Sequence, residues 1–231
     1  MTAVRLTALG RDVLNRYGGA GYSARIFLNL RWRWTPYEEI ASRLPEQGAI
    51  LDLGSGHGLL SMALAINQPG RAVRGIDHDI SRLELARRAA SGMANLSYSA
   101  GGLLEAIAEP ALRGSLAGIV AMDTLHYLTL PGQEAFLANA RRALRPDGVL
   151  LIRDVDAGAG KTFLINRWHE RIMTGLGFTR AERLNFRRQA DWLRILAQTG
   201  FDAASEPCSR FPFADQLFVC RPTVAHVSLA A

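Results

Sequence analysis

The sequence contains only two cysteines in 231 residues, and it has no long uninterrupted apolar run. Cys208 and Cys220 fit neither a zinc pattern nor a disulfide framework, so we expect two free, buried thiols in a reducing compartment. Because no stretch of about 18 apolar residues occurs, a transmembrane helix is not expected. The N-terminus has scattered charges and no apolar segment typical of a secretory signal, so the predicted location is the cytoplasm.

Lysine is almost absent as well. Lys161 is the only lysine among 27 basic residues, so 26 are arginine, and the net charge is +6. Guanidinium groups suit carboxylates and phosphates, which favours acidic partners such as an acyl carrier protein, although a GC-rich codon bias explains the composition equally well. Residues 25–34 alternate arginine with apolar and aromatic residues. They suit an amphipathic helix with snorkelling arginines, a carrier-protein contact or an anionic membrane surface better than nucleic-acid binding.

The order of apolar segments predicts one α/β domain with a helical N-terminal cap. Residues 1–45 have helical character in two pieces, 4–17 and 23–44, and the domain covers 46–231. The alternation of strands and helices predicts a doubly wound parallel sheet that binds ligands at the carboxyl ends of its strands. Strands are expected at 49–53, 72–76, 95–99, 118–122 and 149–152, and helices at 58–67, 80–92, 102–109 and 133–143. Residues 156–200 are predicted to form a substrate lid with helices at 161–175 and 188–199, and strands at 203–209 and 215–221 end the domain.

The most informative segment is residues 49–58, Ala-Ile-Leu-Asp-Leu-Gly-Ser-Gly-His-Gly. An apolar run ends in Asp52, and three glycines at alternate positions precede a helical segment. This pattern predicts a buried strand, a sharp turn whose backbone amides approach a ligand, and a helix whose N-terminus faces that ligand. The spacing differs from the G-x-G-x-x-G pattern of dinucleotide sites, so NAD(P) binding is a weaker alternative. A glycine turn without a ligand is another.

A second acidic residue follows at a suitable distance. Residues 72–77, Ala-Val-Arg-Gly-Ile-Asp, predict the next strand, and Asp77 lies 19 residues beyond Gly58 (77 − 58). An acid about 20 residues after the glycines meets the ribose hydroxyls in such folds. A carboxylate suits two neighbouring hydroxyls because it accepts a hydrogen bond from each. A solvated turn acid is the alternative for Asp77, and Asp79 has the character of a helix N-cap.

The D-x-G-x-G-x-G pattern resembles motif I of the class I S-adenosylmethionine-dependent methyltransferases. Residues 119–128, Ile-Val-Ala-Met-Asp-Thr-Leu-His-Tyr-Leu, are similar to the strand-four sequence of that family, and the resemblance covers about residues 45–222. It implies a Rossmann-like, mostly parallel seven-stranded sheet with an antiparallel last strand. It also implies S-adenosylmethionine as the cofactor and S-adenosylhomocysteine as the product.

The same resemblance assigns roles to individual residues. The glycine loop would lie under the methionine part of the cofactor, Asp77 would bind the ribose, His78 would lie beside the adenine, and Asp123 would lie near the sulfonium. Residues 99–102, Ser-Ala-Gly-Gly, lack the acid that many relatives use for the adenine amino group, so backbone amides or the Ser99 hydroxyl would replace it. No metal site is expected. The expected cofactor-binding residues are Asp52, Gly54, Ser55, Gly56, Gly58, Asp77, His78, Gly101 and Asp123.

Methyl transfer needs an aligned nucleophile, and it needs a base only if the acceptor atom carries a proton. His126, after strand four at the expected mouth of the site, is the first candidate for a base, and packing against cofactor or loop is the alternative role. Asp154 is the second candidate, with Arg153 as an anion anchor. His169, beside Trp168 in the predicted lid, is a weaker candidate. Tyr17, Tyr22 and Tyr37 are candidates to close the N-terminal side of the site.

We therefore expect a methyltransferase of secondary metabolism that acts on a small-molecule acceptor, more readily at oxygen than at nitrogen or carbon. Methylation of a macromolecule or of an intermediate bound to an acidic acyl carrier protein is one alternative. A non-catalytic cofactor-binding module is another. The sequence does not identify the acceptor, because specificity depends on the variable cap and lid.

Overall fold

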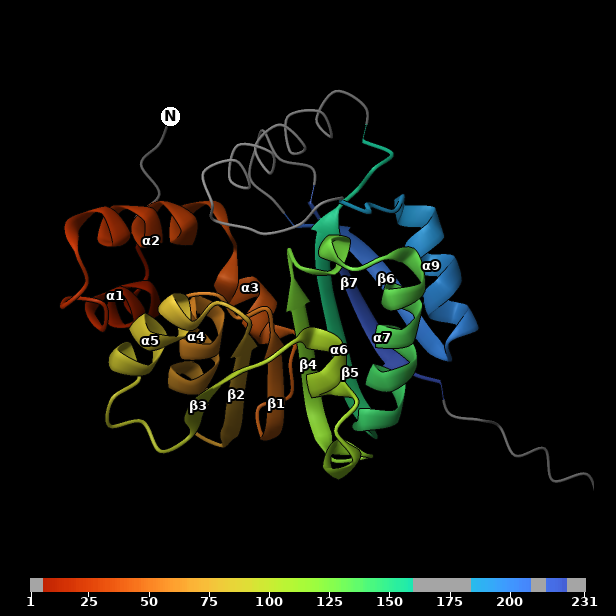
Figure 1. Cartoon of the computed structure of the whole chain (residues 1–231), viewed down its shortest axis with the longest axis horizontal. Coiled ribbons are helices and arrows are strands. Elements are labelled where there is room, and N and C mark those ends of the chain that lie inside the picture. Colours follow the sequence, from red (N-terminus) through yellow and green to blue (C-terminus); the bar gives the residue numbers. More distant parts are fainter. Residues whose placement is uncertain (1–5, 160–183, 209–214, 224–231) are drawn as a thin grey trace, which may run out of the picture.

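The structure is a computed structural model that describes residues 6–159, 184–208 and 215–223 (Figure 1). A seven-stranded sheet in the order β3-β2-β1-β4-β5-β7-β6 forms its centre. The strands are β1 (Gly48–Leu53), β2 (Arg71–Asp77), β3 (Leu96–Ala100), β4 (Leu116–Met122), β5 (Leu144–Val155), β6 (Phe201–Pro207) and β7 (Asp215–Pro222). The pairs among β1 to β5 are parallel, and β7 is antiparallel to both β5 and β6. The predicted sheet, including its antiparallel last strand, is confirmed.

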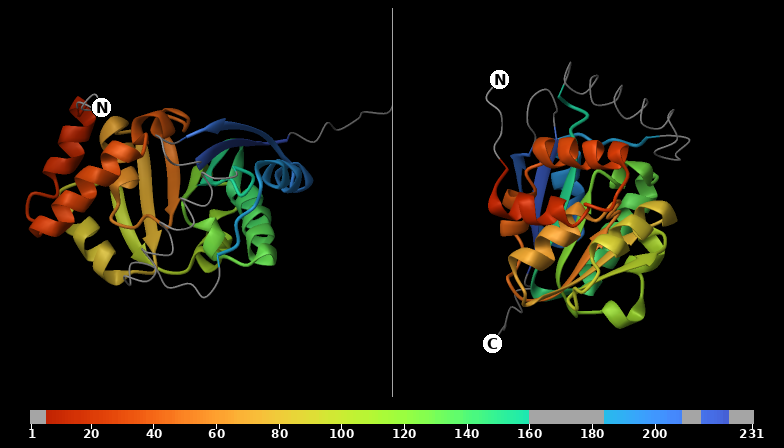
Figure 2. Two further views of the ribbon diagram at one scale, coloured as in Figure 1. Left: turned by 90° about the horizontal axis from the view of Figure 1, so that it is seen from above. Right: turned by 90° about the vertical axis from the view of Figure 1, so that its left-hand side faces the viewer.

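Helices cover both faces of the sheet, as the view from above in Figure 2 shows. They are α1 (Ala8–Asn15), α2 (Tyr22–Trp34), α3 (Tyr37–Ser42), α4 (Leu59–Asn67), α5 (Ile80–Ala89), α6 (Leu103–Ile107), α7 (Leu130–Ala143) and α9 (Gln189–Gln198), with short 3₁₀ turns at Pro110–Leu112 and Leu125–Tyr127. In Figure 1, α1 and α2 lie at the opposite end of the molecule from α9.

The side chains of each strand point alternately to the two faces of the sheet, which divides the hydrophobic core into two clusters. Ile50 and Val120 belong to the cluster that α1 to α5 cover, whereas their neighbours Leu51 and Ile119 belong to the cluster that α6, α7 and α9 cover. All four side chains are fully buried, because successive side chains of a strand point to opposite faces and both faces are covered here. This double burial explains the nearly continuous apolar runs from which the strands were predicted.

The N-terminal helices differ from the prediction. The expected helix at 23–44 is two helices, α2 and α3, separated at Thr35 and Pro36. Proline lacks an N–H and disfavours helical geometry in the residue before it, and Thr35 is accordingly extended, with φ −106° and ψ 128°. The expected helix at 4–17 is the shorter α1, whose N-cap is Thr7.

The C-terminal predictions are confirmed where the structure describes them. The helix expected at 188–199 is α9, and the two last strands form the expected hairpin. Cys208 and Cys220 are buried and free, and burial raises the pKa of both thiols. The helix expected at 161–175, most of the expected lid and His169 lie outside the described residues.

Candidate cofactor pocket

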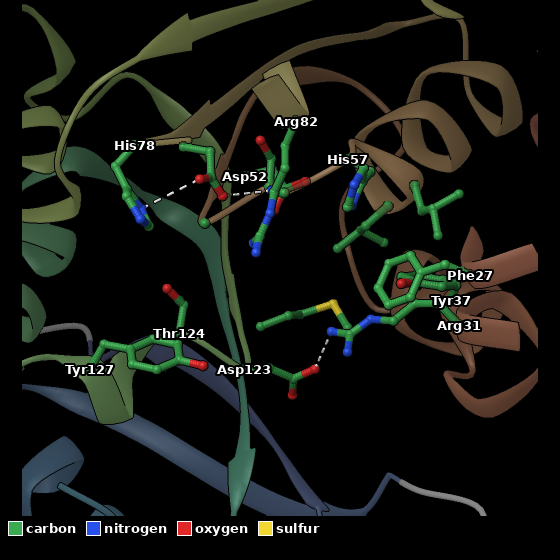
Figure 3. A pocket seen from close by; sticks show the side chains of 17 residues that line it. Phe27, Arg31, Tyr37, Asp52, His57, His78, Arg82, Asp123, Thr124 and Tyr127 are labelled. Atoms are coloured by element: carbon green, nitrogen blue, oxygen red, sulfur yellow. Dashed lines mark hydrogen bonds and ion pairs between the residues drawn. The ribbon is translucent and has the colours of Figure 1, made fainter. Parts of the chain in front are cut away.

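A pocket opens at the carboxyl ends of β1, β2 and β4, beneath α2 (Figure 3). This is the edge of a parallel sheet at which ligands of doubly wound folds bind, and β1 lies between β2 and β4 at its centre. The pocket is lined by Phe27, Arg31, Tyr37, Asp52, Gly54, Ser55, Gly56, His57, Leu59, Leu60, Asp77, His78, Arg82, Met122, Asp123, Thr124 and Tyr127. Seven of the nine expected cofactor-binding residues are among them; Gly58 and Gly101 are not.

The glycine loop between β1 and α4 forms one wall of the pocket. Gly56 and Gly58 both have positive φ angles, of 55° and 79°. A Cβ atom on Gly58 would lie 2.2 Å from the Tyr98 hydroxyl, whereas one on Gly56 would meet nothing within 4 Å. Gly58 is therefore required by packing at the start of α4, and Gly56 keeps open the space in which a ligand can approach the backbone.

Asp77, at the end of β2, is held in place by the loops on either side of it. Its two carboxylate oxygens accept hydrogen bonds from the backbone N–H of Gly56 at 2.8 Å and of Asp79 at 2.9 Å. The residue is only 4% exposed, yet it lines the pocket. A carboxylate has about four acceptor positions, so two remain for ligand hydroxyls.

His78 and Gly101, the two residues expected near an adenine, differ in position. His78 lines the pocket next to Asp77, with its Nδ1 3.4 Å from Oδ1 of that carboxylate, and its side chain is mostly exposed. Gly101 does not line the pocket; its N–H instead donates to the carbonyl of Asp77, which extends the pairing of β2 and β3. Its expected contact with a cofactor is not supported by this position.

Asp52, within β1, lies at the base of the pocket and is almost completely buried. Burial raises its pKa to about 6; the hydrogen bond that Ser61 donates opposes this shift, and the nearby charge of Asp77 adds to it. A positively charged ligand group next to Asp52 would favour its ionised form.

Asp123 follows β4 and has a positive φ of 52°, the only such value for a non-glycine residue in the described part of the chain. Its carboxylate accepts from Arg31 of α2 at 2.7 Å, as Figure 3 shows, and also from Arg153 of β5. Burial opposes ionisation, but the two guanidinium groups outweigh it and lower the pKa of Asp123. The pocket therefore contains a carboxylate that stays charged.

Arg153, expected as an anion anchor, does not face the pocket. It is 5% exposed and does not line the pocket. Its guanidinium lies between Asp123 and Asp215, and its Nε donates to the carbonyl of Cys208 at 3.0 Å. The ion pairs fix the end of β4 to β5 and β7, so Arg153 contributes to the shape of the pocket and to its charge through Asp123.

His126 lies behind the pocket and not at its mouth. It is completely buried, its Nδ1 is 2.7 Å from Oδ1 of Asp154, and its ring packs against those of Tyr127 and Phe186. Neither His126 nor Asp154 lines the pocket, whereas Tyr127, the next residue along the chain, does. The expected position of His126 is wrong, although its pairing places both expected catalytic residues together.

Several pocket residues were not predicted as a site. Phe27 and Arg31 come from one face of α2, where their four-residue spacing is the only sequence signal. The pocket also includes Arg82.

The three tyrosines expected near the site differ in position. Tyr37 lines the pocket. Tyr17 is buried and its hydroxyl donates to the carbonyl of His57, whereas Tyr22 is 81% exposed.

His57 is the neutral imidazole of the glycine loop. Burial, together with the positive charges of Arg82 and Arg31, lowers its pKa to about 4. Its ring lies 5.3 Å from that of Phe27, so the loop contacts α2 across the pocket.

Residues 50–148 match a family of methyltransferase domains. The matched segment is less than half of the chain, and it includes the glycine loop, Asp77 and Asp123. A curated relative, the release factor glutamine methyltransferase of Mycobacterium leprae, is 33% identical over 133 residues, which cover 53% of this chain and 44% of the relative. The chain therefore spans less than half of that relative's length.

Two solved structures show the same fold as this protein. The pyocyanin biosynthetic protein PhzM has a TM-score of 0.65 at 18% identity, over 94% of this chain and 63% of its own. The O-methyltransferase NcsB1 from neocarzinostatin biosynthesis, solved with S-adenosylmethionine and 2-hydroxy-5-methyl naphthoic acid, has a TM-score of 0.58 at 22% identity, over 80% of this chain and 53% of its own.

Two features of the pocket suit a bound ligand. The Ser55 hydroxyl is buried at the pocket wall without a hydrogen-bond partner among the described residues, and the space beside Gly56 is open. Among the described residues, no helix is long and apolar enough to cross a membrane, and no cluster of side chains suits a metal ion.

Proposed function

We propose that this protein transfers the methyl group of S-adenosylmethionine to a hydroxyl oxygen of a small-molecule acceptor. The observation that carries the proposal is Asp77, a buried carboxylate whose two oxygens are anchored by backbone N–H groups at the edge of the glycine-loop pocket. An anchored carboxylate with unused acceptor positions is suited to the two ribose hydroxyls of the cofactor. The likeness to the fold of NcsB1, named as an O-methyltransferase, supports oxygen as the acceptor atom.

The residues around Asp77 supply the rest of the cofactor site. We assign the ammonium group of the cofactor to Asp52, whose pKa of about 6 would fall beside a positive charge. Gly54, Ser55 and Gly56 would hold the amino-acid part of the cofactor, and His78 would lie beside its adenine; all four residues line the pocket. Asp123 and Tyr127 also line the pocket, and we assign them to the region where the acceptor would enter.

The sulfonium of the bound cofactor supplies an activated methyl group, so the protein has mainly to align the acceptor and exclude water. We assign His126 and Asp154 a positioning role, because both are buried and neither lines the pocket. Their hydrogen bond, together with the ring contact of His126 to Tyr127, holds Tyr127 at the pocket wall.

The cofactor site is tested by the affinity of purified protein for S-adenosylhomocysteine, measured by isothermal titration calorimetry. The wild-type protein should bind it, and Asp77→Ala should weaken binding by roughly tenfold or more, because two hydrogen bonds to a charged acceptor are lost. His126→Asn is the matched control and should change the affinity by less than about twofold. Absent binding by the wild-type protein would remove the proposed function, and an unchanged affinity of Asp77→Ala would remove the ribose assignment.

The His126→Asn variant also tests the role of His126, once screening has identified a hydroxyl compound that accepts the methyl group. The measurements are turnover and its pH profile. If His126 positions Tyr127, His126→Asn lowers turnover while the pH profile keeps its shape. If His126 instead removes the acceptor proton, the variant loses the titration step near neutral pH, and the positioning assignment is wrong.

A further inference from the structure

The outward face of α2 carries a row of large apolar side chains. Tyr22, Ile26, Leu30 and Trp34 repeat every fourth residue, and they are 81, 44, 41 and 47% exposed. Residues four apart lie above one another on a helix, so the four side chains form one stripe along the whole length of α2. We call it the α2 stripe. In the described part of the chain, only Ile80 and Leu130 are other large hydrophobic residues of comparable exposure, and they belong to other helices.

Positive charge accompanies the α2 stripe. Arg25 and Arg33 are exposed on the same side of the helix, and α2 contains no acidic residue. Residues 6–34 as a whole contain five arginines and one acid, Asp12. The third arginine of α2, Arg31, points to the other side and pairs with Asp123 in the cofactor pocket. The outer face of α2 is therefore apolar and basic, whereas its inner face contributes Arg31 to the pocket.

A small polar hollow lies next to the α2 stripe, between α1 and α2. Arg11 and Asn15 of α1 and Arg25 and Asn29 of α2 line it, together with Leu6, Leu14, Tyr17 and Leu28. Two guanidinium groups and two amides supply hydrogen-bond donors of the kind that a phosphate group accepts from. The apolar stripe and the anion-binding groups therefore lie side by side on one surface.

We propose that the outer face of α2 docks this protein on an anionic phospholipid membrane, with the stripe among the acyl chains near the headgroups and a headgroup phosphate in the α1–α2 hollow. A single helix with an aromatic residue at each end, arginines on its flank and no acid is the composition of a helix that lies in a membrane interface. A stripe that stands out from the helix suits a deformable bilayer, whereas a protein partner would have to supply a matching groove. The docking does not depend on methyl transfer.

The test is co-sedimentation of the 231-residue protein with vesicles of phosphatidylcholine, either alone or with phosphatidylglycerol added. The wild-type protein should sediment with the vesicles that contain phosphatidylglycerol, and added salt should release it. Ile26→Ser combined with Leu30→Ser should lower the partition coefficient by roughly tenfold or more, because two apolar side chains that would enter the bilayer are lost. Arg25→Glu combined with Arg33→Glu should lower it by a similar factor.

The matched control combines Ile80→Ser with Leu130→Ser, which removes two equally apolar and similarly exposed side chains outside α2. This variant should sediment like the wild-type protein, and circular dichroism should show that all variants remain folded. The proposal is overturned if the wild-type protein does not sediment with anionic vesicles, or if the control loses as much binding as the α2 variant. It is also overturned if the α2 substitutions abolish binding to an acidic carrier protein, or self-association in gel filtration, while vesicles remain unbound.

Discussion

Gly56 and Gly58 of the glycine loop have the same backbone preference but different surroundings. Gly56 and Gly58 both adopt positive φ, but only Gly58 lies against another side chain, that of Tyr98. The first residue belongs to the pocket and the second to the packing of α4 on β3. The two requirements are mixed in one short motif and can be separated by substitution.

Gly58→Ala should lower the free energy of unfolding by roughly 2–5 kcal/mol, because backbone strain adds to a clash with Tyr98. Gly56→Ala should cost roughly 1–2 kcal/mol, since only the strain applies. Its methyl group should nevertheless weaken S-adenosylhomocysteine binding by entering the pocket. Urea denaturation and calorimetry measure the two quantities. Equal stability losses for the two variants would contradict this separation.

The sequence predicts the part of the site that lies within short segments. Asp52 and Asp77 lie near the ends of β1 and β2 and the glycines follow β1, so their spacing along the chain determines where they meet. Arg31 could not be predicted in this way, because its partner Asp123 is 92 residues away and the pairing depends on how α2 crosses the sheet. His126 was misplaced for a similar reason: Asp154 and Phe186, which bury it, come from distant segments.

Among the elements, the contact of β4, β5 and β7 depends on a buried ion-pair network. Arg153 of β5 lies between Asp123 after β4 and Asp215 of β7. Burial raises the pKa of Asp215 to about 6, although the charge of Arg153 opposes this shift. Desolvation of the charged carboxylate is therefore unfavourable within this network. The order of apolar segments predicted the strands that form the sheet. It did not predict this ion-pair network, because its members are far apart in the sequence and nothing in the sequence shows that they pair.

Arg153→Met should lower the free energy of unfolding by roughly 3–5 kcal/mol, because it leaves two buried carboxylates without their shared cation. Arg43→Met is the matched control: it removes the pair of Arg43 with Glu206, whose side chains are 48 and 42% exposed, and should cost less than about 1 kcal/mol. Urea denaturation at neutral pH measures both. A loss for Arg153→Met no larger than that of the control would show that the network does not stabilise the sheet.

At the scale of the whole molecule, the pH dependence of stability combines opposing contributions. Burial raises the pKa of Asp52 and of Asp215 to about 6, so each stabilises the fold at acidic pH and loses that contribution as pH rises towards 6. The pKa of His57, about 4 and below its usual value, acts in the opposite direction. Its contribution is present above the unfolded pKa of about 6.5 and is lost as pH falls towards 4.

Replacing His57 isolates one of these contributions. When the pH is lowered from about 7.5 to about 5, the free energy of unfolding of the wild-type protein should fall by roughly 1–2 kcal/mol more than that of His57→Gln. The carboxylates are the same in both proteins, so their effects cancel in the difference. Denaturation curves at the two pH values measure it, and parallel losses would show that His57 titrates normally in the folded protein.

The break at Pro36 makes α2 a separate helix, and Arg31 joins this helix to Asp123. If α2 shifted, Arg31 would move with it, and Asp123 would then have Arg153 as its remaining counter-ion. The electrostatic potential in the pocket would become more negative, which favours the cationic sulfonium of the proposed cofactor over the neutral thioether of its product. The position of one surface helix therefore bears on which form of the proposed cofactor the protein binds more tightly.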